Sequence, residues 1–163
     1  AAAYHRCDVA GPETYEWMRA SASMPLCSRP VASAGRRYLD GGLADSVPLA
    51  YCRSLGHDRC VVVLTRPRGY RKQNSALSAL CRPLLWRLPA IYRALRARAA
   101  LYNAQLDFVA AEEAKGAALV VRPPADLPIG RISHDPEAMR RVHAIGLETG
   151  KEILPRLREF LAG

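Results

Sequence analysis

The segment RYLDGGLADSVPL, residues 37–49, contains two carboxylates, Asp40 and Asp45, that could take part in catalysis. Asp40 follows a strand-like run and precedes Gly41 and Gly42. A carboxylate at the end of a strand is a usual position for a catalytic group in α/β proteins, where it can accept a proton. Asp before Gly is also a common tight turn, because the Asp side chain bonds to nearby backbone and Gly is conformationally permissive. From the spacing alone, the turn is the favoured interpretation.

Motifs for other kinds of chemistry are absent from the sequence. No serine lies in Gly-X-Ser-X-Gly, and neither glycine-rich nucleotide-binding pattern occurs. The five cysteines and four histidines form no spacing typical of a metal site. We therefore predict no metal and no cofactor. We expect reduced, mostly buried thiols, which favour a reducing compartment. The segment ASASMP, residues 20–25, is interpreted as structural.

The elements that must position Asp40 are predicted from periodicity and from proline and glycine. Two apolar runs rich in Val, residues 59–65 and 117–124, predict strands that each end at proline. Neither alternates polar and apolar residues, so we expect a sheet covered on both faces. The largely helical segment between them favours a parallel pair. Helices are predicted at residues 48–56, 89–116 and 135–163. The fold class is therefore α/β.

The predicted sheet is incomplete, because two buried strands need further neighbours. Residues 1–11 could add one edge strand. Asp135 is predicted to cap the last helix, and Gly146, Gly150 and Pro155 are candidate breaks or kinks in that helix. We expect one domain whose sheet is completed either by a missing segment or by a second copy of the chain.

The charge of the chain is unevenly distributed. The net charge is +9, and ten basic residues but no acidic one lie between Arg59 and Leu106. Such a block forms either a solvated basic face or a surface for an anionic partner. We predict no nucleic-acid binding, because no nucleic-acid motif accompanies the charge. An anionic membrane surface is the preferred partner. No segment is apolar enough to span a membrane, and the first residues do not form a signal peptide.

Several segments carry a resemblance to a known family. They are YLDGGLADSVPL at residues 38–49, WMRASASMP at 17–25, VVVLTRPRGYRK at 61–72, the helical segment 96–116, and ALVVRPP at 118–124. The first resembles the Asp-Gly-Gly element of the patatin-like phospholipase/esterase family, and the second resembles the Ala-Ser-X-X-X-Pro segment that precedes it. The others are similar to the following strand, helix and strand in the bacterial esterase branch of that family. The similarity runs in the same order over most of the chain.

The resemblance implies a serine hydrolase of lipid or small esters with a Ser-Asp dyad, built as an α/β/α sandwich with mostly parallel strands. Asp40 would accept the serine proton, and Gly41 and Gly42 would form the tight turn beside the nucleophile. The family's Gly-X-Ser-X-Gly serine and glycine-rich oxyanion loop precede Asp-Gly-Gly, and this chain contains neither. We therefore expect residues 1–163 to be the C-terminal portion of one hydrolase domain, inactive alone because the nucleophile-bearing portion is missing.

The remaining candidate residues have structural alternatives. Asp45 is expected to support the loop or cap the following helix. Tyr70, Arg71 and Lys72 are candidates for anion contacts, with a solvated loop as the alternative. The alternative function is a non-catalytic module that forms homodimers and binds anionic membranes or a protein partner through its basic face. In either case we expect a cytoplasmic protein, or one peripheral to a membrane.

Overall fold

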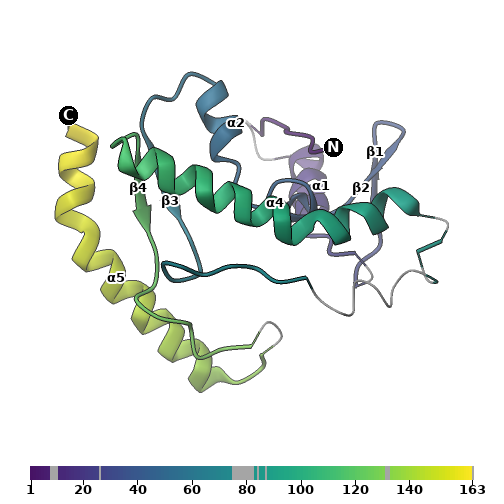
Figure 1. The fold of residues 1–163 in the computed structure, drawn as a ribbon. Coiled ribbons are helices and arrows are strands. Elements are labelled where there is room, and N and C mark those ends of the chain that lie inside the picture. The colour runs from purple at the N-terminus through teal and green to yellow at the C-terminus, as the bar shows by residue number, and fades with distance from the viewer. Residues whose placement is uncertain are drawn as a thin grey trace. The chain divides into compact units, whose positions relative to one another are not determined.

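The structure is a computed structural model of the chain, and it describes residues 1–7, 11–25, 27–74, 83, 85–86, 88–130 and 133–162. Helices and strands are interspersed along the described chain, which confirms the α/β class (Figure 1). The described strands form two sheets of two strands each. Both sheets are open, which agrees with the prediction of an incomplete α/β sheet.

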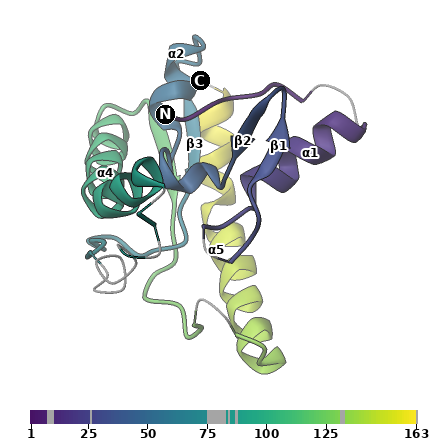
Figure 2. The same cartoon turned by 90° about the vertical axis from the view of Figure 1, so that its right-hand side faces the viewer.

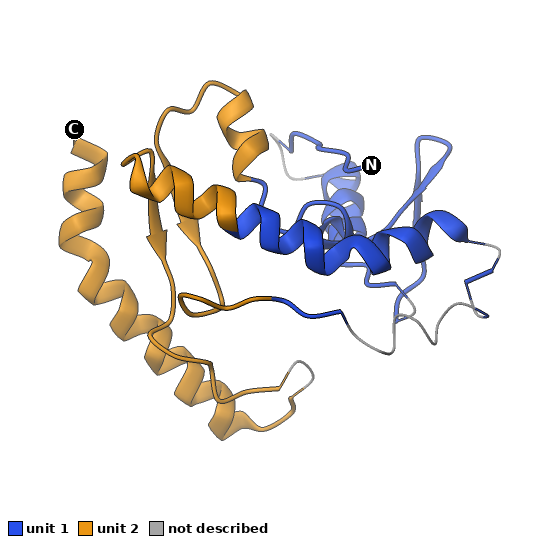
Figure 3. Cartoon of the chain, in the orientation of Figure 1, with its two compact units in different colours: residues 1–48, 72–106 blue, residues 49–71, 107–163 orange. Residues whose placement is uncertain are grey.

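The chain divides into two compact units (Figure 3). The first contains Ala1–Pro48 and Lys72–Leu106, and the second contains Leu49–Arg71 and Asp107–Gly163. Each unit is therefore built from two stretches that are distant in sequence. The long helix α4, Pro89–Ala114, contributes its N-terminal part to the first unit and its C-terminal part to the second.

The first unit contains a helix beside a hairpin (Figure 2). Besides part of α4, its elements are α1 Pro12–Ser21, β1 Val31–Ser33, β2 Arg36–Tyr38 and the short 3₁₀ helix η1 Gly41–Leu43. The two strands are antiparallel and so short that neither could hold its position alone. The hairpin is therefore stabilised by what it packs against.

The packing of the hairpin is set by its turn and by an aromatic contact. Ala34 and Gly35 both have positive φ, 47° and 71°, as in the two-residue turns that match strand twist. Val31 lies opposite Tyr38 and is buried. The Trp17 ring of α1 meets the Tyr38 ring edge-on at 4.9 Å. The strand β2 is thereby fixed two residues before Asp40.

The second unit contains the predicted parallel pair. Its elements, besides part of α4, are α2 Leu49–Ser54, β3 Cys60–Val63, β4 Ala118–Val121 and α5 Pro136–Ala162. Strands β3 and β4 are parallel, and α4 lies in the connection between them. The predictions of two strands and a helical crossover are confirmed. Helix α2 contacts β3, and α5 contacts β4.

The prediction that both strands are covered on both faces was wrong for β3. Cys60 and Val62 are buried, whereas Val61 is 41% and Val63 72% exposed. Within the described residues, β3 packs through one face although its sequence is apolar on both. The prediction holds for most of β4, where Ala118, Leu119 and Val120 are buried.

The predicted cap of α5 is confirmed, but the predicted breaks are not. Asp135 Oδ1 accepts the N–H of Glu137 at 2.9 Å. The helix continues through Gly146, Gly150 and Pro155 to Ala162. One proline removes a single N–H donor, and the remaining hydrogen bonds of a 27-residue helix maintain it.

The predicted edge strand at the N-terminus is not seen in the described part of residues 1–11. Residues 1–7 contain no strand, and residues 8–10 lie outside the described residues. His5 instead stacks on Trp17 with ring centroids 3.5 Å apart. Within residues 1–7, the His5 ring therefore packs on Trp17 of α1, and no strand is formed.

Candidate active site

Asp40 lies in a tight turn directly after β2. Its N–H donates to the carbonyl of Ser23 at 2.8 Å, which ties the turn to the end of α1. Its Oδ1 accepts the N–H of Gly42 at 2.7 Å, so Asp40 caps η1. Among the described residues, no group donates a hydrogen bond to the second oxygen, Oδ2. The half-buried carboxylate is thus oriented through one oxygen, and the other can accept a proton.

The two glycines after Asp40 differ in their surroundings. A Cβ atom on Gly42 would lie 3.1 Å from Asp40 Oδ1 and 3.7 Å from both Arg98 Nη2 and Ser46 Oγ. A Cβ atom on Gly41 would meet no atom within 4 Å. Neither glycine adopts a positive φ. Gly42 therefore provides space beside the carboxylate, and Gly41 does not.

The carbonyl of Gly42 is held from two sides. It accepts the Ser46 hydroxyl at 2.8 Å and Nε of Arg98 at 3.1 Å. Arg98 belongs to α4, in the part of that helix that lies in the first unit. The same residue whose N–H orients Asp40 is therefore fixed through its carbonyl by α4.

Asp45 supports the loop and does not cap α2. Its Oδ1 accepts Nε2 of Gln105 at 2.7 Å, and its Oδ2 accepts the hydroxyl of Tyr4. The N–H groups of Ser46 and Val47, just before α2, donate to Oε1 of Gln105, each at 3.2 Å. The side chain that bonds to these two N–H groups is therefore Gln105, which no motif in the sequence marks.

Tyr70, Arg71 and Lys72 are each engaged by neighbouring side chains. The Arg66 guanidinium lies 4.9 Å from the centre of the Tyr70 ring. Arg71 donates to Asp107, and this hydrogen bond and charge raise the pKa of Arg71 and lower that of Asp107. These contacts hold Tyr70 and Arg71 within the second unit. A role in anion binding stays a prediction.

Lys72 is fastened to α4 in the first unit. Its N–H donates to Oδ1 of Asn103 at 2.8 Å, and its carbonyl accepts Nδ2 of the same side chain at 3.0 Å. Its ammonium lies 4.8 Å from the centre of the Tyr102 ring. One amide side chain thus pairs with both backbone groups of Lys72.

The basic block between Arg59 and Leu106 is partly neutralised by acidic residues from elsewhere in the sequence. Arg66 pairs with Asp126 at 3.5 Å, and Arg68 pairs with Glu113 at 3.1 Å. Two further members of the block, Arg82 and Arg87, lie outside the described residues. Arg66 and Arg68 are thus paired with acidic side chains from later in the sequence, and a role of the block in binding an anionic partner stays a prediction.

The prediction of mostly buried thiols was wrong. Cys7 and Cys27 are exposed, Cys52 is half-buried and Cys60 is buried, and all four are free. Cys81 lies outside the described residues. The two exposed thiols lie in loop segments, which have no core to cover them. Among the described residues, no group of His, Cys, Asp or Glu side chains could hold a metal ion.

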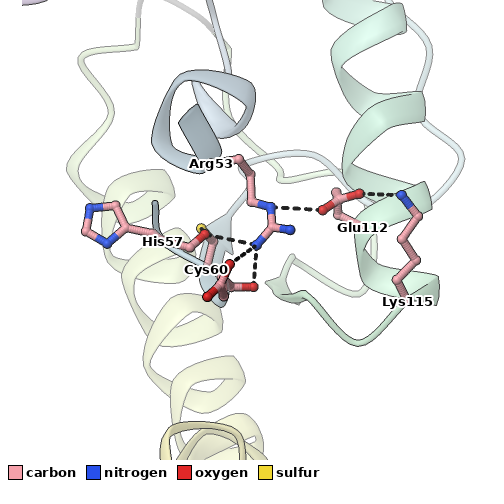
Figure 4. Close-up of polar contacts among 6 residues, drawn as sticks. Arg53, His57, Cys60, Glu112 and Lys115 are labelled. Carbon is pink, nitrogen blue, oxygen red and sulfur yellow. Dashed lines mark hydrogen bonds and ion pairs between the residues drawn. The ribbon is translucent and has the colours of Figure 1, made fainter. Parts of the chain in front are cut away.

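A buried carboxylate in the second unit is the other notable polar group (Figure 4). Glu112 is 3% exposed and pairs with Arg53 Nε at 3.2 Å and with Lys115 Nζ at 2.7 Å. Arg53 also donates to the carbonyls of His57 and Asp58 (Figure 4). The cluster joins α2, the loop before β3 and the end of α4. Among the described residues no buried side-chain nitrogen or oxygen lacks a hydrogen-bond partner, so we assign the cluster a structural role.

The charge state of this cluster follows from its contacts. The hydrogen bond from Lys115, with the charges of Lys115 and Arg53, holds the pKa of the Glu112 carboxyl below its ordinary value, although burial opposes this. Burial and the neighbouring Cys52 thiol raise the pKa of Cys60. Cys60 is therefore a neutral thiol at neutral pH and a poor nucleophile.

Glu112→Gln should lower Tm by about 3–8 °C at pH 7, because it removes a paired buried charge. A folded-state pKa below the unfolded value of 4.5 gives stability that is present above that pH and is lost as the pH falls through the folded pKa. The difference in Tm between wild type and variant should therefore shrink below about pH 4. Scanning calorimetry across this range measures it.

Glu148→Gln is the matched control, since that side chain is 64% exposed and pairs with Lys151 at 3.4 Å. Exposed pairs contribute little to stability. If wild type and Glu112→Gln differed in Tm by the same amount at acidic and neutral pH, the assigned charge of Glu112 would be contradicted.

No helix in the described part of the chain is long and apolar enough to cross a membrane. The apolar residues of the two longest helices, α4 and α5, are interrupted by charged ones.

Comparisons with known proteins identify two matched segments. Residues 5–53 match the family model described as patatin-like phospholipase. Residues 88–162 match a model described as a domain of unknown function, DUF6363. Lysophospholipase NTE1 of Coccidioides immitis (strain RS) is 29% identical over 158 residues, covering 88% of the chain. The chain covers 10% of the length of that protein.

The residues of the candidate site fall into both matched segments. Asp40, Gly42 and Asp45 lie in the first matched segment, whereas Arg98 and Gln105 lie in the second. The bacterial branch stays a prediction. The chain is patatin-like in the segment that carries Asp40, which confirms the resemblance predicted from the sequence.

Proposed function

We propose that residues 1–163 are the aspartate-bearing part of a patatin-like serine acyl hydrolase that cleaves carboxylic esters of lipids. The observation that carries this proposal is the carboxylate of Asp40, oriented through Oδ1 by the N–H of Gly42, with Oδ2 accepting no hydrogen bond among the described residues. A general base needs this combination of fixed orientation and an open lone pair. The family match over residues 5–53 and the similarity to a protein named a lysophospholipase support an ester substrate.

In this proposal the serine and the oxyanion donors come from a segment outside residues 1–163. Asp40 takes the serine Oγ proton as that oxygen attacks the ester carbonyl. The tetrahedral intermediate expels the alcohol, which leaves with the proton from Asp40, and an acyl-serine remains. Water then attacks the carbonyl of the acyl-serine as it loses a proton to Asp40, and Asp40 returns that proton to the serine Oγ as the bond to the acyl group breaks and the fatty acid is released. Serine and aspartate perform every proton transfer, so the cycle uses no metal or cofactor.

A fluorophosphonate probe tests the proposal, because it modifies an activated serine covalently. We define the longer polypeptide as residues 1–163 together with the proposed nucleophile-bearing segment. By intact mass, the longer polypeptide should gain one adduct, and it should hydrolyse a p-nitrophenyl ester and a lysophospholipid. Residues 1–163 alone should gain none and hydrolyse neither.

Two results would overturn the proposal. The longer polypeptide could stay unlabelled and inactive, which would exclude a serine hydrolase. Alternatively, residues 1–163 alone could gain an adduct, and peptide mapping would then locate the nucleophile within this chain. Heat-denatured protein is the control for nonspecific labelling.

A further inference from the structure

Two side chains of α4 hold the loop that follows Asp40. Arg98 Nε donates to the carbonyl of Gly42 at 3.1 Å. Gln105 bonds to Asp45 and to the N–H groups of the next two residues. Arg98 and Gln105 are seven residues apart, about two helical turns, so they project from the same face of the helix. One face of α4 therefore contacts both ends of the loop 42–47.

The contact with Gly42 is coupled directly to Asp40. The N–H of Gly42 donates to Asp40 Oδ1 at 2.7 Å, while its carbonyl is held by Arg98 and Ser46. The two ends of a residue move together, so a shift of this carbonyl shifts the N–H that orients the carboxylate. Arg98 Nη2 also lies 3.7 Å from the position of a Gly42 Cβ atom, next to Asp40 Oδ1. A positive charge is therefore present on the side of Gly42 where the carboxylate lies.

The contact with the other end of the loop satisfies several groups at once. Oε1 of Gln105 accepts two N–H groups at 3.2 Å, and its Nε2 donates to Asp45 at 2.7 Å. A side-chain amide can do both, because its oxygen accepts up to two hydrogen bonds while its nitrogen donates. Its removal would leave two backbone donors and one carboxylate oxygen without partners in a half-buried position.

From these contacts we infer that Arg98 and Gln105 are positioning residues for the proposed catalytic Asp40. The inference rests on the proposed function. It also assigns a role to the part of α4 that belongs to the first unit, within the segment that matches the domain of unknown function. That part of the helix fixes the aspartate loop of the patatin-like segment. The two matched segments would then act as one catalytic unit, although they lie far apart in the sequence.

The first test replaces Gln105 by Leu in the longer polypeptide. Leu has a similar size but forms no hydrogen bond. The expected result is a fall in kcat of about 10–100-fold with KM changed less than about threefold, since displacing a catalytic group by an ångström has effects of this order. Gln105→Glu keeps the acceptor for Ser46 and Val47 but places a second carboxylate against Asp45, so it should not restore the wild-type rate.

The second test separates positioning from general stability by hydrogen exchange. In Gln105→Leu, the amides of Ser46 and Val47 should exchange faster. The amide of Asp45, which donates to the carbonyl of Gly41 at 2.8 Å, should stay protected. Arg98→Lys keeps the charge and should retain more activity than Arg98→Met. Arg96→Met, on an exposed part of α4, is the control and should behave as wild type.

Three outcomes decide the inference. Wild-type kcat in both Gln105→Leu and Arg98→Met, with Asp40→Asn inactive, overturns the inference and leaves the proposed function intact. Exchange that increases throughout residues 12–48 also overturns it, because the effect is then general unfolding. If Asp40→Asn is fully active, the proposed function fails. In that case, faster hydrogen exchange at Ser46 and Val47 in Gln105→Leu would still show that Gln105 bonds to these amides. The inference would nevertheless be rejected, because Asp40 would not be a catalytic group to position.

Discussion

Asp40→Asn in the longer polypeptide is expected to lower kcat for ester hydrolysis by about 10³-fold, with KM changed less than about threefold. The proposed reaction uses Asp40 twice, to accept a proton from serine and then from water. An amide cannot accept a proton at neutral pH. The loss should be confined to kcat, because the proton moves only in the transition state. Steady-state kinetics with a p-nitrophenyl ester measures both constants.

Asn at this position keeps the structural role of the side chain. Its Oδ1 can accept the N–H of Gly42, as Asp40 does at 2.7 Å, so Tm should change by less than about 2 °C. Asp58→Asn is the matched control, since that side chain is 98% exposed. A folded Asp40→Asn variant with the wild-type rate would exclude Asp40 as the base and overturn the proposed function.

The regular elements could be predicted from sequence because their signals are local. Two Val-rich runs ended by proline gave β3 and β4, and proline and glycine gave the bounds of α4 to within about two residues. Ser23 fits the structural interpretation of residues 20–25, since its hydroxyl donates to the Arg19 carbonyl at 2.8 Å. Each of these features depends on residues that are close together in the chain.

Features that depend on packing could not be predicted. Strand β1 has three residues, too few for a periodic pattern, and it is held by its partner strand and by α1. The exposure of Val61 and Val63 has the same origin, because an apolar run does not reveal which of its faces a helix will cover. The ion pairs of the basic block could not be predicted for a related reason. Its partners Glu113 and Asp126 come from later in the chain.

The candidate site likewise contains one residue that a local motif predicts and others that depend on packing. Asp40 was selected because the Asp-Gly-Gly sequence is itself a local motif. Arg98 and Gln105 carry no such signal, because their contacts with Gly42 and Asp45 span 56 and 60 residues. Such contacts exist only once α4 lies against the loop. A motif therefore identified the group proposed to react, whereas the groups that hold it in place required the structure.

The structure also separates two glycines that the sequence treats as a pair. Gly42→Ala in the longer polypeptide is expected to lower kcat by about 10²-fold, because its Cβ atom would lie 3.1 Å from Asp40 Oδ1. That oxygen accepts the N–H of Gly42, so it can move away only by weakening the bond that orients it. Arg98 Nη2 and Ser46 Oγ, each 3.7 Å from the same point, limit the room for the methyl group to move elsewhere.

Gly41→Ala should keep kcat within about twofold of wild type, since its Cβ atom would meet nothing within 4 Å and its backbone is not left-handed. Both variants add one methyl group and remove one glycine, so they share the change in unfolded-chain entropy. Any difference in rate between them comes from the native site. Equal losses in the two variants would show that the pair acts through backbone flexibility. A loss in Gly42→Ala alone would show that the second glycine provides the space in which the Asp40 carboxylate is held.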